Sequence, residues 1–105
     1  MRDNSADVDE PFDTGFKALS DHNRRTIIRM VFENPGITLQ EISAVFPVSR
    51  FAVMNHINIV ERAGIIRSEK ESIYRHFYPV AGTMQRLFDE WLASLPEAGT
   101  QKGGR

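Results

Sequence analysis

The sequence predicts a mainly α fold with one small β-hairpin, in the order α-α-α-α-β-β-α. Apolar residues recur at helical spacing through most of the chain before Gly64, and again after Pro79. Between these two residues the period changes to about two, and β-branched and aromatic residues become frequent. Paired stop and start signals at 34–38 and 47–49 divide the helical part into separate helices.

The composition is that of one ordinary globular domain. The chain has 105 residues, of which 41% are apolar and 26% charged. It has no cysteine, which excludes disulfides, thiolate metal sites and cysteine nucleophiles. No apolar stretch is long enough to span a membrane, and the N-terminus is acidic, unlike a signal peptide. We therefore expect a soluble, cytoplasmic protein that makes no membrane contact.

Charge is unevenly distributed along the chain. The formal net charge is −1, but residues 1–13 carry five acidic residues and only one basic residue. Residues 14–95 carry ten basic and eight acidic residues, so this part has a charge of +2. A mildly basic domain is compatible with modest, salt-sensitive binding to nucleic acid.

The first two predicted helices follow a polar N-terminus. Residues 1–10 have almost no apolar anchor and are expected to be disordered. A short helix is predicted over 11–20, with Phe12 and Phe16 on one side. Asp21 caps the next helix, which is predicted over 22–33 and stopped by the Asn-Pro-Gly segment after it.

Residues 38–64 are predicted to form two helices joined by a short turn. Thr38 and Glu41 form a capping box that starts the first helix, and Pro47 ends it. Ser49 is the N-cap of the second helix, and Gly64 is its C′ residue. The apolar residues of the first helix are Leu39, Ile42, Val45 and Phe46, and those of the second are Val53, Ile57 and Val60.

The outer face of the second helix is unusual for a solvated surface. Two guanidiniums, two amides and two apolar side chains replace the expected Glu, Lys and Gln. This face consists of Arg50, Phe51, Met54, Asn55, Asn58 and Arg62. A short supporting helix followed by such a helix is typical of a helix-turn-helix whose second helix enters the DNA major groove. Two packed helices of any small all-α domain are the alternative interpretation.

A two-stranded hairpin is predicted after Gly64. Its strands are expected at 65–67 and 73–78, with a polar turn at 69–72, and Pro79 ends it. A hairpin in this position corresponds to the wing of a winged helix-turn-helix. The glutamates at its tip argue against strong DNA contact by the loop, so Arg67, Lys70 and Arg75 are better candidates for phosphate contact.

The last predicted helix covers residues 81–95 and carries a wide apolar stripe. We expect part of this stripe to pack on a second copy of the chain, together with two aromatic residues near the N-terminus. The expected dimer interface consists of Phe12, Phe16, Met84, Leu87, Phe88, Trp91, Leu92 and Leu95. Alternatively, the stripe only completes the core of the monomer. Residues 96–105 are expected to be an unstructured tail, which leaves 11–95 as the domain.

The order of these elements resembles the ArsR/SmtB family of winged helix-turn-helix repressors. The resemblance runs from about Phe16 to Trp91. The segments that match the family most clearly are 17–21 followed by Arg24 and 27–28, then 39–42, 48–53, 56–57, 60–61 and 63–66. It implies a homodimer, formed by the first and last helices, that presents two recognition helices to a pseudo-palindromic operator.

The chain also departs from this family. Many members bind metals through cysteines or through Asp and His on the last helix, but here there is no cysteine and the last helix has no histidine. The adjacent Asp89 and Glu90 point in different directions. We therefore expect no metal and no cofactor. The wing lacks the usual Gly-Arg at its tip, and Phe51 and Met54 replace small or polar residues, so a different base sequence should be read.

Individual residues suggest individual contacts. Arg50 suits guanine, Asn55 and Asn58 suit adenine, and Phe51 and Met54 suit thymine methyls or a protein surface. Ser49 is mainly a cap, and His56 is more easily explained as structural or phosphate-facing than as a ligand. The expected DNA-binding set is Ser49, Arg50, Phe51, Met54, Asn55, His56, Asn58, Arg24, Arg67, Lys70 and Arg75.

No nucleophile with a base, phosphate loop or carboxylate pair is present, which argues against an enzyme. The sequence thus predicts a homodimeric DNA-binding regulator, in the form of a repressor. A winged-helix module that binds protein through Phe51 and Met54 is the alternative. Regulation by an unknown small-molecule inducer stays open.

Overall fold

The computed structural model describes the backbone of residues 5–97 and the side chains of residues 11–97. Five helices and three strands follow one another in this part of the chain. They are α1 (Ser5–Leu19), α2 (His22–Glu33), β1 (Ile37–Thr38), α3 (Leu39–Ser43), α4 (Arg50–Arg62), β2 (Ile66–Glu71), β3 (Tyr74–Pro79) and α5 (Thr83–Ser94). This is the predicted fold class, with one short strand added.

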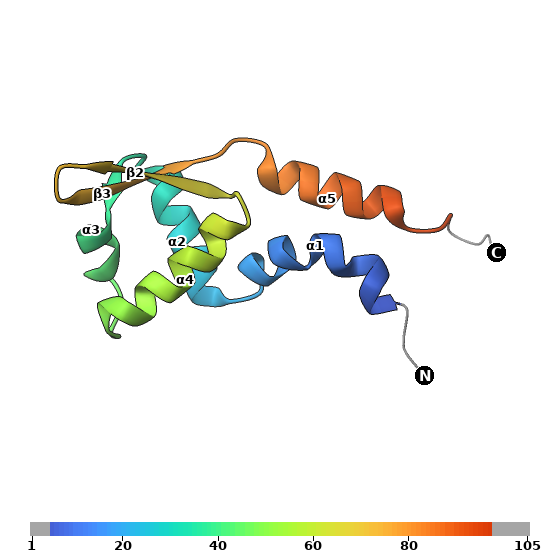
Figure 1. Ribbon diagram of the computed structural model, residues 1–105, viewed down its shortest axis with the longest axis horizontal. Helices are drawn as coiled ribbons and strands as arrows, with labels where there is room; N and C mark the ends of the chain where they lie inside the picture. The colour runs from blue at the N-terminus through green and yellow to red at the C-terminus, as the bar shows by residue number, and fades with distance from the viewer. Residues whose placement is uncertain (1–4, 98–105) are drawn as a thin grey trace.

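The molecule has a head and a stalk. In the head, α2, α3 and α4 pack against an antiparallel sheet with the strand order β1-β3-β2 (Figure 1). In the stalk, α1 and α5 run side by side away from the head (Figure 1). Within residues 11–97, the buried side chains all belong to the head except Ala18, at the end of α1 near its junction with α2.

One hydrophobic core holds the head together. Apolar side chains from α2, α3, α4 and the sheet meet there, which is the main source of stability for a domain of this size. The largest fully buried residues are Phe77, Ile27, Ile42, Ile57, Ile65, Ile66, Val31, Val53 and Val60.

The N-terminal boundary of the first helix was predicted wrongly. Helix α1 begins at Ser5 and contains Pro11, whereas the sequence predicted disorder through residue 10. A proline inside a helix removes one backbone hydrogen bond, and the turns on either side keep theirs. Residues 1–4 and 98–105, also expected to be disordered, lie outside the described residues.

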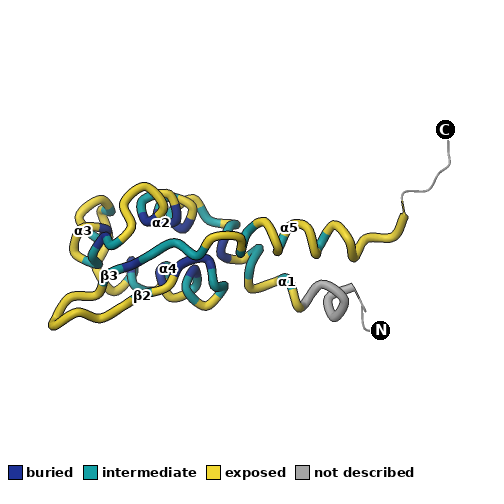
Figure 2. Tube along the Cα trace, turned by 90° about the horizontal axis from the view of Figure 1, so that it is seen from above, coloured by how far each residue is buried: buried dark blue, intermediate teal, exposed yellow. Residues whose placement is uncertain are grey.

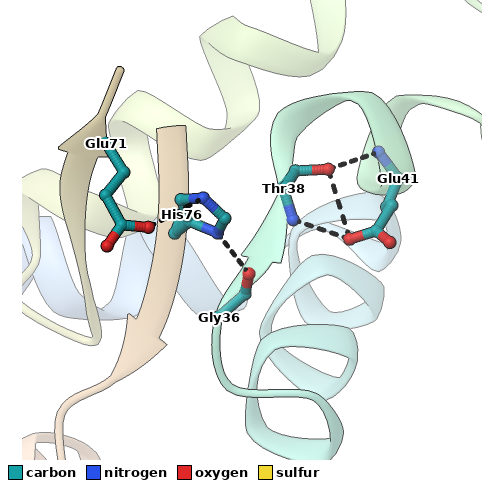
Figure 3. Close-up of polar contacts among 5 residues, drawn as sticks. All are labelled: Gly36, Thr38, Glu41, Glu71 and His76. Atoms are coloured by element: carbon teal, nitrogen blue, oxygen red, sulfur yellow. Dashed lines mark hydrogen bonds and ion pairs between the residues drawn. The ribbon is translucent and has the colours of Figure 1, made fainter. Parts of the chain in front are cut away.

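The first helix of the helix-turn-helix is shorter than expected. Helix α3 ends at Ser43, so Val45 leaves the helical period and is 57% exposed instead of buried. The capping box is present: Thr38 Oγ1 accepts from the Glu41 N–H at 3.2 Å, and the Thr38 N–H donates to Glu41 Oε1 at 2.9 Å (Figure 3).

The sheet differs from the prediction in two details. Residues 37–38 form β1, which pairs with β3 at Ile37↔Phe77 and Thr38↔His76. The hairpin turn lies later than expected, at residues 72–73, with Ser72 at φ 60. Residues 69–71 continue the strand because each pairs with a residue of β3 across the hairpin.

Candidate nucleic-acid interface

Helix α4 is fixed at both ends. Ser49 has extended backbone (φ −66, ψ 155), and its Oγ accepts from the Ala52 N–H at 3.1 Å. At the other end, Gly64 has φ 78, its N–H donates to the Glu61 carbonyl, and the Ile65 N–H donates to the Val60 carbonyl. These two bonds form a Schellman motif. The predicted caps are confirmed, and they set the length and direction of the helix.

The two faces of α4 have opposite environments. Its inner face buries Val53, Ile57 and Val60, none of which is more than 1% exposed. The exposed residues of its outer face are Arg50, Phe51, Asn55, Asn58 and Arg62. Phe51 is 76% exposed, which is unusual for a large aromatic side chain without a partner. A row of amides, a guanidinium and an exposed ring can contact base edges in a major groove.

Met54 belongs only partly to this outer face. Its side chain is half-buried and packs against the core of the head. The sequence placed it fully on the outer face, but its position in the helix lies between the inner and outer faces. Met54 is therefore less accessible to a base than Phe51.

The prediction that Arg24 contacts phosphate is wrong. Its side chain is only 8% exposed, and its guanidinium donates to carbonyls at the end of α1: Nη2 to Lys17 O at 2.7 Å and Nε to Ala18 O at 3.3 Å. The end of a helix leaves carbonyls without partners and has negative potential, so a guanidinium is stabilising there. Arg24 is a structural residue that joins α1 to α2.

His56 takes part in the same cluster. Arg24 Nη1 donates to His56 Nδ1 over 3.2 Å, and since arginine has no acceptor, the imidazole must accept through this nitrogen. His56 is half-buried and links α4 to α2. This contact favours the structural interpretation of His56 over direct phosphate contact. No sequence pattern indicated the Arg24–His56 contact, because the two residues are far apart in the chain.

Asp21 stabilises the start of α2 beside this cluster. Its carboxylate accepts from the Asn23 N–H at 2.7 Å and the Arg24 N–H at 3.3 Å. Desolvation tends to raise the pKa of Asp21, but these backbone bonds and the charge of Arg24 lower it below its usual range. The predicted N-cap is therefore confirmed and is held in its ionised form.

The wing has two chemically different faces because side chains alternate along its strands. Lys70 pairs with Arg75 across the hairpin, and the next pair on the same face is Ser68 and the buried Phe77. Ser68, Lys70 and Arg75 line a hollow with Leu39 of α3, so the basic face lies toward the helix-turn-helix. The acidic residues of the wing lie on the other face. They therefore oppose phosphate contact by Lys70 and Arg75 less than the sequence suggested.

The acidic face of the wing is tied to the loop before β1. His76 Nδ1 donates to the Gly36 carbonyl at 2.8 Å, and His76 Nε2 lies 3.5 Å from Glu71 Oε1 (Figure 3). Arg67, on the same face, pairs with Glu69 and lies 4.7 Å over the ring of Tyr78. Phosphate contact by Arg67 would have to replace these contacts, so Lys70 and Arg75 are the more accessible cations.

Helix α5 has no buried residue (Figure 2). Its expected interface residues fall into three groups, and in the first of these Met84 packs against the core of the head. Trp91 packs edge-to-face on Phe16 with ring centroids 5.5 Å apart, and Leu87 lies so close to Gly15 that an added Cβ would be 2.7 Å from it. Phe88, Leu92 and Leu95 point elsewhere and are 45–51% exposed. We call these three residues the α5 ridge.

Neither a metal cluster nor a membrane-spanning helix is found in the described part of the chain. Within residues 11–97, no three His, Asp or Glu side chains come close enough together to hold a metal ion. Among the described helices, none combines the length and apolar character needed to cross a bilayer.

Known proteins share this architecture. A family model described as winged helix-turn-helix DNA-binding matches residues 20–67. An uncharacterized HTH-type transcriptional regulator of Methanocaldococcus jannaschii is 29% identical over 72 residues, 69% of this chain and 81% of that protein. The uncharacterized regulator YuzN of Bacillus subtilis, also described as HTH-type, is 28% identical over 86 residues, 76% of this chain and 94% of that protein.

A solved structure extends the similarity to the stalk. The crystal structure of an ArsR family transcriptional regulator has a TM-score of 0.70 at 26% identity, and the match covers 80% of this chain and 84% of that one. The predicted resemblance to the winged helix-turn-helix regulators of the ArsR family is therefore confirmed, together with the fold class.

Proposed function

We propose that this ArsR-type winged helix-turn-helix transcriptional regulator is a homodimer that binds a specific duplex DNA site and represses transcription from it. The observation that carries the proposal is the outer face of α4, which is polar and aromatic, exposed, and held rigidly by caps at both ends. Such a helix fits the width of the major groove and offers side chains of the kinds that distinguish bases. No catalytic role is assigned.

The base-reading residues in this proposal are Arg50, Asn55 and Asn58, with Phe51 against thymine methyl groups. Lys70 and Arg75 on the basic face of the wing contact phosphates. Among the described residues, these two cations and Arg50 form no ion pair, so all three are available to DNA. The four phosphate-contacting cations of a dimer, Lys70 and Arg75 from each copy, predict a log–log salt slope of about −3.6, since each neutralised phosphate contributes about −0.9.

Dimerisation is supported by the stalk. The α5 ridge exposes two leucines and a phenylalanine on one helix, and apolar side chains of this size are stabilised by about 1.5–3 kcal/mol each when fully buried. A second copy that packs its own ridge on this one would form a two-fold interface and place two α4 helices in the same molecule. Two half-sites would then be bound together.

Repression follows from geometry, because a dimer that occupies a promoter-proximal site blocks access of other proteins to the same duplex. The proposed place of action is the cytoplasm. No metal is needed in this mechanism, so adding zinc to the protein–DNA complex should release no DNA. A zinc titration followed by fluorescence anisotropy checks this.

The exposed ring of Phe51 also favours a second candidate function, docking on another protein without affinity for DNA. Fluorescence anisotropy with a labelled duplex from the chain's own upstream region, at low and moderate salt, separates the two. The proposal expects saturable binding that competitor DNA of random sequence reverses only at large excess. Binding that random DNA reverses equally well would overturn sequence-specific reading, whereas no binding at low salt would favour the protein-docking function.

A further inference from the structure

A hollow lies where the stalk meets the recognition helix. Helix α1 forms one side, α5 the other, and the end of α4 closes it toward the head. The lining residues that matter to its chemistry are Phe12, Arg62, Thr83, Arg86, Leu87 and Glu90. It therefore touches the three helices whose relative positions determine how α4 is held in a dimer.

The lining combines positive charge with an apolar surface. Two basic residues, Arg62 and Arg86, and one acidic residue, Glu90, line the hollow. In the part of the chain whose side chains are described, neither arginine forms an ion pair. Phe12 and Leu87 supply apolar surface beside them. Two guanidiniums next to apolar side chains match an organic anion, because planar donors can bind a carboxylate in bidentate fashion.

The hollow and the α5 ridge lie on roughly opposite sides of α5. Thr83, Arg86 and Glu90 follow one another at spacings of three and four residues on one side of α5. The ridge residues Phe88 and Leu92 lie on the opposite side, and Leu95 follows at the C-cap of the helix. A partner that covers the ridge would leave the hollow open. The occupant of the hollow should therefore be a ligand and not the second copy.

We propose that this hollow binds a small organic anion with an apolar body, and that binding there regulates the affinity of the protein for DNA. Ligand binding is independent of the proposed function, whereas its effect on DNA affinity rests on that function. The carboxylate of the ligand pairs with Arg62 and Arg86, and its apolar body packs on Phe12 and Leu87. Glu90 repels a simple anion and limits its affinity.

The position of Arg62 explains how such a ligand would act on DNA binding. Arg62 is the last residue of α4, and Arg86 is on α5. The same junction is already linked by Thr83 Oγ1, which donates to the Gly64 carbonyl at 2.7 Å. A ligand that joins the two arginines selects one angle between α4 and α5. The DNA affinity then changes by a factor equal to the ratio of the ligand's affinities for the free and the DNA-bound arrangements of the protein.

The binding test uses benzoate and hexanoate as probes, with benzamide and hexanamide as uncharged controls of matching shape. Titrations of the full chain are followed by NMR chemical shifts. We expect saturable binding of the acids with Kd on the order of 1 mM, a normal affinity for a fragment of this size, and none of the amides. Perturbed amides should cluster at 11–15, 62–65 and 83–90.

Two variants should change the affinity for benzoate in opposite directions, and a third variant is the control. Arg86→Gln should weaken benzoate binding about tenfold, since a charge-assisted contact is lost. Glu90→Gln should strengthen it about threefold, because the repulsive charge is removed. Arg29→Gln should leave it unchanged, since Arg29 is an exposed arginine outside this hollow. Equal binding of acid and amide, or equal affinities in the Arg86→Gln and Arg29→Gln variants, would overturn the site.

The regulatory part is tested separately on the protein–DNA complex. Saturating benzoate should change the affinity for a selected duplex about fivefold or more, and the change should disappear in Arg86→Gln. If benzoate binds the free protein but does not change a measurable DNA affinity, the proposed regulation is overturned and the proposed binding site stands. If no DNA affinity exists, the proposed function fails, and the NMR titration still decides the site.

Discussion

Helices α4 and α5 have nearly the same length, 13 and 12 residues, yet they contribute to the structure in different ways. Helix α4 buries Val53, Ile57 and Val60 completely in the head, whereas α5 buries no residue completely. Both helices carry an apolar stripe in the sequence. The stripe of α4 meets a core within the chain, and most of the stripe of α5 meets only α1 or solvent.

This difference distinguishes the part of the chain that stabilises the fold from the part that is available for association between copies. The head contains its own closed core, so its stability depends on this chain alone. The stalk leaves three large apolar side chains of α5 half-exposed, which is the pattern of a surface that is completed by a second copy. Substitutions on the inner face of α4 should therefore act on folding, and substitutions on the α5 ridge should act on association.

The largest effect is expected in the core face of α4. Ile57→Ala should lower the free energy of unfolding by about 2–5 kcal/mol, because a fully buried side chain is removed and a cavity remains. Urea denaturation followed by circular dichroism measures this at a protein concentration where the dimer is dissociated. Leu92→Ala should cost less than about 1 kcal/mol under the same conditions, since Leu92 is 46% exposed. Equal losses would remove the distinction between head and stalk.

A charge on the α5 ridge should break the dimer. In Phe88→Glu, each copy places a carboxylate in the interface, so the dimer should be weakened by about 2–4 kcal/mol, or roughly 30- to 1,000-fold in Kd. Sedimentation equilibrium measures this. Ala93→Glu is the matched control, because Ala93 is an exposed residue of the same helix away from the ridge. A wild-type monomer at micromolar concentration, or an unchanged dimer in Phe88→Glu, would contradict the proposed interface.

The outer face of α4 should affect DNA binding without affecting folding. Arg50→Ala should weaken binding to a selected duplex by about 1–3 kcal/mol and binding to random DNA much less. Fluorescence anisotropy on both duplexes gives the two losses. Arg29→Ala controls for the loss of one surface charge. Equal losses on the two duplexes would reassign Arg50 to phosphate contact.

A smaller effect isolates the ring of Phe51. Replacing thymine with uracil throughout the selected duplex removes only methyl groups, and should weaken binding by about 0.8 kcal/mol for each methyl that Phe51 covers. In the Phe51→Ala variant the two duplexes should bind alike. The double-mutant design separates this contact from any change in DNA shape. A thymine preference that persists in Phe51→Ala would exclude the contact.

The smallest effect is the dependence of stability on pH through Asp21. Its pKa is lowered in the folded state, so its ionised form stabilises the fold above about pH 4, and this contribution is lost as the pH falls through the folded pKa. Asp21→Asn keeps a capping side chain but cannot titrate. The difference in unfolding free energy between wild type and Asp21→Asn should therefore shrink on acidification from pH 6 to pH 3. A constant difference would contradict the role of the charge.

Local chemistry explains which parts of the fold could be predicted. The capping box at Thr38, the N-cap at Ser49 and the C′ glycine at Gly64 depend on residues within a few positions of one another. These signals also placed α4 correctly, and with it the outer face that we propose reads DNA. The contacts with bases and phosphates remain predictions.

The errors come from contacts between distant residues. Arg24 was placed on DNA because a basic residue near a helix start often meets phosphate, but its partners are carbonyls of α1 and the ring of His56. Strand β1 exists only because β3 pairs with it. The division of the α5 stripe into a seam with α1 and an exposed ridge depends on Gly15, whose lack of a Cβ lets Leu87 approach.

Selection from a random duplex library by the purified chain tests the central claim most directly, because it needs no knowledge of the operator. Two α4 helices in one dimer predict an inverted repeat whose half-site centres are about 10 base pairs apart, or a multiple of this. Sequencing of the enriched pool shows whether such a repeat is present. Enrichment of a single half-site, or of no sequence at all, would contradict a dimer that reads DNA through α4.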